Sequence, residues 1–298
     1  MEEFKPSKFE KAPYLELKDY KAPEKINAYF VPMDDGVRIR VCHWLGHKEN
    51  SKGTILLQQG HNEFIEKYYE TIQEFLDRNY SVIAFDWRGQ GMSDHQIKDI
   101  HKSYIKDFER HDKDLNYILD QIIENNFPKP LIGIGHSMGG CLMLSAFHNH
   151  PLKFTHGILS APMLGFKNEK FLRTASSLMN FFKKDTDYLI GSKPNMGMET
   201  PFEDNDLTSD QMRYKRTQML VRKMPSIRLW GVTNSFAKAV NKRLKLIRRK
   251  NWAETIGLKI LIINNLNDIV VDPKKIRNMQ KRLKNSEIIE FDLSLIHI

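Results

Sequence analysis

The sequence has few cysteines, no long apolar run and no recognisable signal peptide. Cys42 and Cys141 are the only two cysteines among 298 residues. Because the first residues are polar and include early acids, secretion is not expected, and we predict that both thiols are reduced core residues. No stretch approaches the roughly 18 apolar residues that span a bilayer. We therefore expect a cytoplasmic protein.

Motifs for metals and cofactors are also absent. The sequence contains no cluster of metal ligands, no dinucleotide fingerprint, no internal repeat and no low-complexity tract. We therefore expect neither a metal nor an organic cofactor. Hydrophobic residues make up 41% of the chain and charged residues 28%, which excludes a wholly disordered protein.

Acidic residues are missing from residues 211–250, and this absence concentrates the net charge of +9. Residues 167–250 hold 19 Lys and Arg against 8 Asp and Glu, whereas the rest of the chain holds 27 against 29. Such a segment suits an anionic surface, so peripheral contact with the inner face of a membrane is one interpretation. The other is a solvated helical face. Nucleic acid is disfavoured because the segment has no nucleic-acid-binding motif.

Short apolar runs alternate with helical patterns along most of the chain. Asp-Gly in the turn at residues 34–36 favours a β-hairpin between the first two runs, and the later runs are typical of buried parallel strands with right-handed crossovers. Strands are predicted at 26–33, 37–44, 54–58, 81–86, 131–135, 156–160, 258–264 and 288–291. Helices are predicted at 65–78, 104–126, 138–148, 171–182, 211–224 and 274–283.

The alternation stops after Pro162 and returns near residue 258. Helical periodicity continues between them without a strand-like run, which predicts a helical cap inserted into one α/β core. The chain is accordingly divided into a lead-in, a first core part, a cap and a second core part. These parts are residues 1–25, 26–166, 167–250 and 251–298.

The motif Gly135-His136-Ser137-Met138-Gly139 follows a predicted strand and opens a predicted helix. This strand–turn–helix setting is the one that a nucleophile elbow requires. The serine must sit on a tight, strained turn, so the residues two before and two after it must lack bulk. Ser137 is therefore predicted to be a nucleophile, with the start of the helix favouring negative charge beside it.

Partners for Ser137 are expected at the carboxyl ends of later strands, in the order acid then histidine. Asp268 lies just past the strand 258–264 and is the predicted acid, whereas Asp272 before Pro273 is the predicted N-cap of the next helix. His297 is the one histidine after Asp268 and is the predicted base. We expect residues 293–298 to be a truncated or altered end.

An oxyanion needs two backbone N–H donors. One is expected from Met138, directly after the nucleophile, and the other from His61, in the loop that follows the strand 54–58.

Several segments together resemble the bacterial lysophospholipase and monoacylglycerol lipase group of the α/β-hydrolases. The similar segments are the oxyanion loop at 60–68, the Asp-x-Arg-Gly-x-Gly-x-Ser loop at 86–94, a lid segment at 205–210 with Arg213 and Tyr214, and the acid loop at 267–271. Three departures stand out: Gln59 replaces the family's histidine, the glycine before the acid loop is replaced within residues 264–267, and the base region lacks Gly-x-x-His-Glu. In that group the loop at 86–94 shapes the sheet edge, so Asp86 and Asp94 are expected to be structural.

The resemblance implies an α/β-hydrolase fold and hydrolysis of a single-chain lipid ester, through an acyl-enzyme on Ser137. A small-molecule esterase or a peptidase on the same scaffold is one alternative, and a non-catalytic basic module that binds membrane or nucleic acid is another. Apolar cap residues either line an acyl tunnel or pack the cap onto the core. They are Phe171, Leu172, Leu178, Met179, Phe181, Phe182, Leu220, Val221, Met224, Ile227, Leu229 and Trp230.

Overall fold

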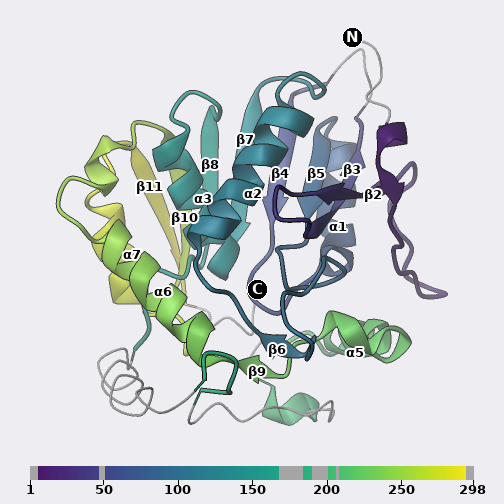
Figure 1. The fold of residues 1–298 in the computed structure, drawn as a ribbon. Helices are drawn as coiled ribbons and strands as arrows, with labels where there is room; N and C mark the ends of the chain where they lie inside the picture. Colours follow the sequence, from purple (N-terminus) through teal and green to yellow (C-terminus); the bar gives the residue numbers. More distant parts are fainter. Residues whose placement is uncertain (1–5, 47–50, 168–183, 190–200, 206–207, 293–298) are drawn as a thin grey trace.

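One mostly parallel sheet runs through the protein and carries helices on both faces (Figure 1). A computed structural model describes residues 6–46, 51–167, 184–189, 201–205 and 208–292. The strand order is β1-β2-β3-β5-β4-β7-β8-β10-β11. From β5 to β11 each neighbouring pair is parallel, while β2 and β3 form the predicted antiparallel hairpin. The predicted α/β-hydrolase architecture is confirmed.

The elements of the described residues have the following bounds. The large sheet contains β1 (Glu10–Lys11), β2 (Asn27–Pro32), β3 (Arg38–Trp44), β4 (Thr54–Gln58), β5 (Ser81–Phe85), β7 (Leu131–His136), β8 (His156–Ser160), β10 (Lys259–Asn265) and β11 (Ser286–Phe291). A small parallel sheet pairs β6 (Lys102–Ser103) with β9 (Gly231–Val232). The α-helices are α1 (Tyr69–Asp77), α2 (Glu109–Ile118), α3 (Ser137–Asn149), α5 (Gln211–Lys223), α6 (Asn234–Ile247) and α7 (Pro273–Gln280). Short helical turns are η1 (Pro6–Lys8), η3 (Ile65–Tyr68), η4 (Leu119–Ile123), η5 (Phe202–Asp204), η6 (Pro225–Ile227) and η7 (Ala253–Thr255).

Alternate residues of the central strands enter two separate apolar clusters. Leu56 of β4 packs in the cluster that contains residues of α2, α3, α6 and α7. Its neighbour Leu57 packs on the other face, with Ile72 of α1 and Leu220 of α5. Because successive side chains of a strand point to opposite faces, continuous apolar runs such as Thr54–Gln58 are required for a sheet buried on both sides.

The two cysteines divide between these clusters. Cys42 of β3 belongs to the cluster beneath α1, and Cys141 of α3 belongs to the cluster on the opposite face. Both are buried free thiols, as the sequence predicts. Burial raises the pKa of the Cys141 thiol to about 11 and raises that of Cys42 further still.

The helix predicted at 104–126 begins later than expected, so that start was wrong. Helix α2 begins at Glu109, after the N-cap residue Phe108, and the Glu109 N–H donates to the Asp107 carboxylate at 3.0 Å. Before it, Lys102–Ser103 pairs as strand β6 with Gly231–Val232. A two-residue strand has too short a pattern to be read from the sequence, and β9 lies where no strand was expected.

Helix α6 lies within residues 167–250 but packs into the core. Phe236, Val240 and Leu244 belong to the same cluster as α3. The buried Arg243 guanidinium donates to Ser145 of α3 at 2.6 Å and pairs with Asp112 of α2. Part of the segment that the sequence assigns to the cap therefore stabilises the α/β core directly.

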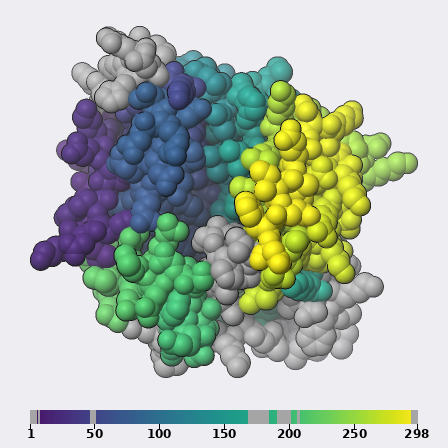
Figure 2. All heavy atoms as spheres, turned by 180° about the vertical axis from the view of Figure 1, so that it is seen from behind, coloured from purple at the N-terminus to yellow at the C-terminus, as the bar shows by residue number. Residues whose placement is uncertain are grey.

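Beyond α1, the rear face of the sheet keeps a partly exposed apolar row. Figure 2 shows this face, with the residues around α1 in blue on one side, the C-terminal residues in yellow on the other and teal residues between them. Ile289 and Phe291 of β11 are 45% and 43% exposed, and on the neighbouring strands Leu261 of β10 pairs with Ile158 of β8, both half-buried. Across the described residues, none of the helices combines the length and apolarity needed to cross a membrane.

Candidate active site

Ser137 lies where β7 ends and α3 begins. Its backbone has a φ of +49°, in the left-handed region that side chains of L-residues disfavour. The residue is half-buried, and among the described residues no group forms a hydrogen bond with its hydroxyl. The serine is thus held on a strained turn with its hydroxyl unengaged, next to the N–H groups that open α3.

Glycines on either side of Ser137 are required by close backbone contacts. A Cβ atom on Gly135 would lie 2.6 Å from the carbonyl oxygen of Gly139. One on Gly139 would lie 2.5 Å from the carbonyl oxygen of Gln59, at the end of β4. Both obstacles are backbone atoms, so neither can move aside without displacing a strand or the helix.

The loop after β4 passes directly beside the nucleophile. A Cβ on Gly60 would lie 3.2 Å from the Cβ of Ser137. The Gly60 N–H donates to Oε2 of Glu63 at 2.7 Å, and the Asn62 N–H donates to Oε1 of Gln90. Between them, the N–H of His61 meets no acceptor among the described residues. The N–H of His61, the residue that the sequence predicts as a donor, is therefore unengaged within the described residues, in a loop that passes beside Ser137.

Glu63 and His61 are both half-buried but differ in charge. Burial opposes ionisation of Glu63, but the charges of Lys67 and His136 and hydrogen bonds from Lys67 and Tyr68 hold the pKa of its carboxyl at about 2. Burial lowers the pKa of His61 to about 4, so its imidazole is neutral at pH 7. The carboxylate of Glu63 thus anchors the loop as an anion.

Asp86, directly after β5, anchors the same region, in the structural role expected for it. Its carboxylate accepts hydrogen bonds from Gln59 Nε2 at 3.0 Å and from the Ile65 N–H at 3.1 Å. It also pairs with the fully buried Arg40. Asp94 pairs with Arg38 at 3.0 Å. Gln59 therefore fastens the end of β4 to this buried carboxylate.

Asp268 lies in the loop after β10, at the same edge of the sheet as Ser137. Its Oδ1 accepts the N–H groups of Val270 and Val271 at 2.8 and 2.9 Å. Its Oδ2 is buried and has no partner among the described residues. Burial raises the pKa of this carboxyl, although the charge of His136 opposes the rise. A buried carboxylate oxygen without a donor is costly, so it suits a hydrogen bond from a further side chain.

The predicted base, His297, lies outside the described residues, and its role stays a prediction. Asp272, by contrast, is the N-cap of α7 as expected, because its side chain accepts the Lys274 N–H at 2.9 Å. No group of three or more His, Cys, Asp or Glu side chains suitable for a metal occurs in the part of the chain that the structure describes.

Comparison with known proteins identifies the family. Residues 49–293 match the family model described as serine aminopeptidase, S33. The chain belongs to this hydrolase family. It is 23% identical to the probable lysophospholipase L2 of Haemophilus influenzae, over 84% of this chain and 79% of that protein. It is 30% identical to the monoacylglycerol lipase of Mycolicibacterium smegmatis, over 43% of each.

Solved structures of two lipases share the fold. A soluble variant of monoglyceride lipase from Saccharomyces cerevisiae aligns with a TM-score of 0.68 at 19% identity, covering 94% of this chain and 89% of that one. The monoacylglycerol lipase of Paleococcus ferrophilus aligns with a TM-score of 0.64 at 20% identity, covering 85% and 88%. At these identities the comparison supports the fold alone.

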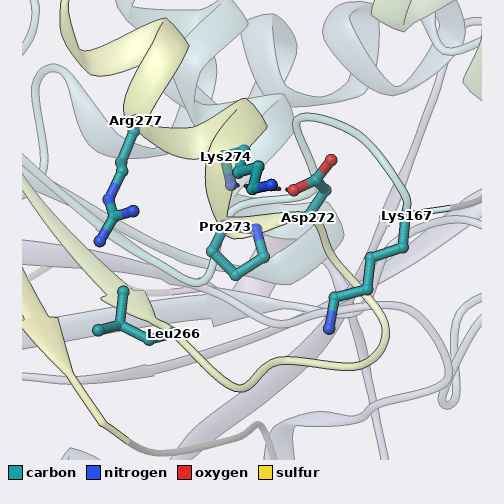
Figure 3. A pocket seen from close by; sticks show the side chains of 6 residues that line it. All are labelled: Lys167, Leu266, Asp272, Pro273, Lys274 and Arg277. Carbon is teal, nitrogen blue, oxygen red and sulfur yellow. Dashed lines mark hydrogen bonds between the residues drawn. The ribbon is translucent and has the colours of Figure 1, made fainter.

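An open cavity of about 480 Å³ lies on the other side of the acid loop of this S33 hydrolase (Figure 3). Figure 3 shows Asp272 turned toward Lys274, while Lys167 reaches in from another segment. The described lining comprises Lys167, Leu266, Asp272, Pro273, Lys274 and Arg277. It includes neither Ser137 nor the loop at 59–63, so the cavity is a neighbour of the acid loop and not the place where a carbonyl would meet the nucleophile.

The basic residues after position 210 are largely engaged within the molecule. Arg213 and Arg216 of α5 both pair with Glu70 of α1. Lys238 pairs with Asp185, and Lys242 pairs with Asp107 and Glu109. Much of the local charge excess therefore neutralises acids of the core and fastens α5 and α6 to them.

The apolar residues of the described cap pack onto the core. Leu220 and Ile227 are buried with Phe64 of the core, and Val221 and Met224 pack against the same cluster. Trp230 stacks on His101 with ring centroids 3.9 Å apart. The packing alternative thus holds for these residues. The other proposed tunnel residues, within 171–182, lie outside the described residues.

No role was predicted for Glu63, Asn62 or Gln90, although all three fix the loop that carries His61. Glu63 carried a usable signal, since a carboxylate three residues after a glycine can accept that glycine's N–H. Gln90 had no recognisable signal in the sequence, because it contacts Asn62 across a separation of 28 residues.

Proposed function

We propose that this S33 hydrolase is a serine esterase that cleaves monoacyl lipids, either lysophospholipids or monoacylglycerols. Ser137 Oγ attacks the ester carbonyl while His297 accepts its proton and Asp268 Oδ2 orients and stabilises the imidazolium. The N–H groups of His61 and Met138 bind the oxyanion. The tetrahedral intermediate expels the glycerol-side alkoxide, which takes the proton from His297. Water then attacks the acyl-enzyme by the same route and releases the fatty acid.

The strained, unengaged Ser137 carries this proposal. A φ of +49° at a half-buried serine has a cost, and the flanking glycines permit the close backbone contacts on either side of it. Among the described residues the N–H of His61, next to Gly60 in the loop that passes beside Ser137, has no acceptor and is free to bind an oxyanion. Together these features support acyl transfer over a purely structural turn.

The lipid substrate is supported by the relatives' names, which are lysophospholipase and monoacylglycerol lipase. The family description instead names an aminopeptidase, so a peptidase or short-chain esterase is the second candidate. Purified protein should hydrolyse lauroyl-lysophosphatidylcholine or monolauroylglycerol faster than butyrate esters or aminoacyl anilides. Preference for either of the last two would overturn the lipid assignment while leaving Ser137 in place.

Covalent labelling tests the nucleophile. A fluorophosphonate probe should label the wild type and not Ser137→Ala. Asp268→Asn should keep the Oδ1 hydrogen bonds from Val270 and Val271 and melt near the wild-type temperature, yet turn over ester about 10²–10⁴ times more slowly. Equal labelling of Ser137→Ala and wild type would reject the mechanism.

The base is tested by His297→Gln against His156→Gln. His156 is an exposed histidine at the start of β8, the edge of the sheet opposite Ser137. Only His297→Gln should abolish turnover. If both variants remain active, the proton acceptor is another group.

Contact with an anionic membrane is also part of the proposal, through the outer side of α5. Met212 and Met219 are 73% and 49% exposed there, and the exposed Lys215 lies between them at helical spacing. An apolar stripe that includes a cation suits the boundary between headgroups and acyl chains.

A further inference from the structure

The loop that carries His61 is tied to the cap by one side chain. Asn62 Nδ2 donates to the carbonyl oxygen of Leu229 at 3.0 Å, and Asn62 Oδ1 accepts the Leu229 N–H at 2.8 Å. Leu229 is buried and lies between η6 and β9. One amide group thus satisfies both backbone groups of a cap residue that is 167 positions away.

The backbone of Asn62 is fixed as tightly as its side chain. Its φ is +59°, a conformation that asparagine tolerates better than most residues. Its N–H donates to Gln90, in the loop after β5. Asn62 is therefore held by the core through its backbone and by the cap through its side chain.

His61 itself touches the same end of the cap. Its Nε2 lies 2.6 Å from the hydroxyl of Ser103 on β6, and β6 pairs with β9. Its ring packs on Phe236 of α6, with centroids 4.6 Å apart. A displacement of β9 or of the start of α6 would therefore move both residues at the tip of the loop.

We propose that Asn62 is a positioning residue. Through it, the geometry of the oxyanion hole depends on the position of the cap residue Leu229. The side chain does not touch substrate; it sets where the His61 N–H points by fixing the next residue to Leu229. This inference rests on the proposed function, since it concerns the same oxyanion. An error near 1 Å at such a donor can cost about 100-fold in rate.

Asn62→Gly is the decisive variant, because glycine adopts a positive φ freely and only the side-chain tie is lost. We expect kcat for a monoacyl ester to fall 10- to 100-fold with KM changed less than about threefold. Asn79→Gly is the matched control, since Asn79 has a φ of +65° in the turn before β5, away from the cap. It should retain wild-type kcat.

Two further measurements separate positioning from general destabilisation. A trifluoromethyl ketone analogue, which forms an oxyanion on Ser137, should bind Asn62→Gly at least tenfold more weakly, whereas the corresponding alcohol should bind equally well. Amide hydrogen exchange at Leu229 should accelerate in Asn62→Gly and not in Asn79→Gly.

The outcomes are distinct. Faster exchange at Leu229 with unchanged kcat and ketone affinity would overturn the proposal, as would unchanged exchange. If the wild type hydrolyses no ester and binds no ketone, the proposed function itself fails; an active wild type with an equally active Asn62→Gly rejects only the positioning role.

Discussion

Ser137, the proposed nucleophile, is also a residue with a strained backbone conformation. A left-handed conformation costs an L-residue about 1–2 kcal/mol, and glycine would avoid that cost. The residue nevertheless occupies this conformation, flanked by glycines whose own substitution is blocked by backbone at 2.5 and 2.6 Å. A serine at a position that favours glycine supports the proposed role of its hydroxyl.

Ser137→Gly is expected to raise the free energy of unfolding by about 1 kcal/mol relative to Ser137→Ala, because only glycine relieves the positive φ. Both variants should lose covalent labelling. Urea denaturation of the pair gives the comparison, and equal stability of the two would show that the turn holds no strain.

Glu63 should make stability depend on pH. Its folded-state pKa of about 2 lies below the ordinary value of 4.5, so its ionised form stabilises the fold above pH 4.5 and this contribution is lost as the pH falls toward 2. Between pH 6 and pH 3, wild type should lose about 1–2 kcal/mol more than Glu63→Gln. Denaturation at both pH values checks this, with the exposed Glu74→Gln expected to follow wild type.

At the scale of elements, two adjacent residues of α6 should behave very differently. Arg243 is buried against Asp112 and Ser145, so Arg243→Met leaves a largely buried carboxylate without its partner and should cost about 3–5 kcal/mol. Lys242 forms its ion pairs at the surface, so Lys242→Met should change stability much less. Thermal melts of both variants test the assignment of α6 to the core.

Most strands could be predicted because each is a short apolar run with a clear end. The predictions for 54–58 and 156–160 coincide with β4 and β8. The start of α2 was missed because Lys102–Ser103 pairs with β9 and Asp107 holds the Glu109 N–H, and a helical pattern in the sequence reports neither contact. Strand β9 was missed because a strand of two residues is too short to show an alternating pattern of apolar and polar residues.

The candidate site was predictable where its residues follow strand ends, as Ser137, His61 and Asp268 do. The residues that hold the site in place could not be predicted, because Asn62 contacts Leu229 and Gln90 only in the folded protein. Local patterns report which elements form, whereas contacts across 167 residues depend on how those elements are assembled.

At the scale of the whole molecule, the proposed membrane contact is tested by vesicle sedimentation. The double variant Met212→Glu, Met219→Glu should bind phosphatidylglycerol vesicles at least tenfold more weakly than wild type, because it places two anions on the outer side of α5. Leu152→Glu is the control, since Leu152 is 96% exposed in the loop between α3 and β8. Equal binding by all three proteins would remove α5 from the interface.

The two buried thiols supply natural reporters for the two halves of the interior. Cys42 and Cys141 lie on opposite faces of the sheet, and neither can meet a thiol reagent until its own face opens. Following the alkylation of each by mass spectrometry would therefore time two separate opening events in a single unmodified chain. Equal alkylation rates would mean that the apolar clusters on the two faces of the sheet open together. Faster alkylation of Cys42 would mean that the cluster under α1 and α5 opens while the other stays closed.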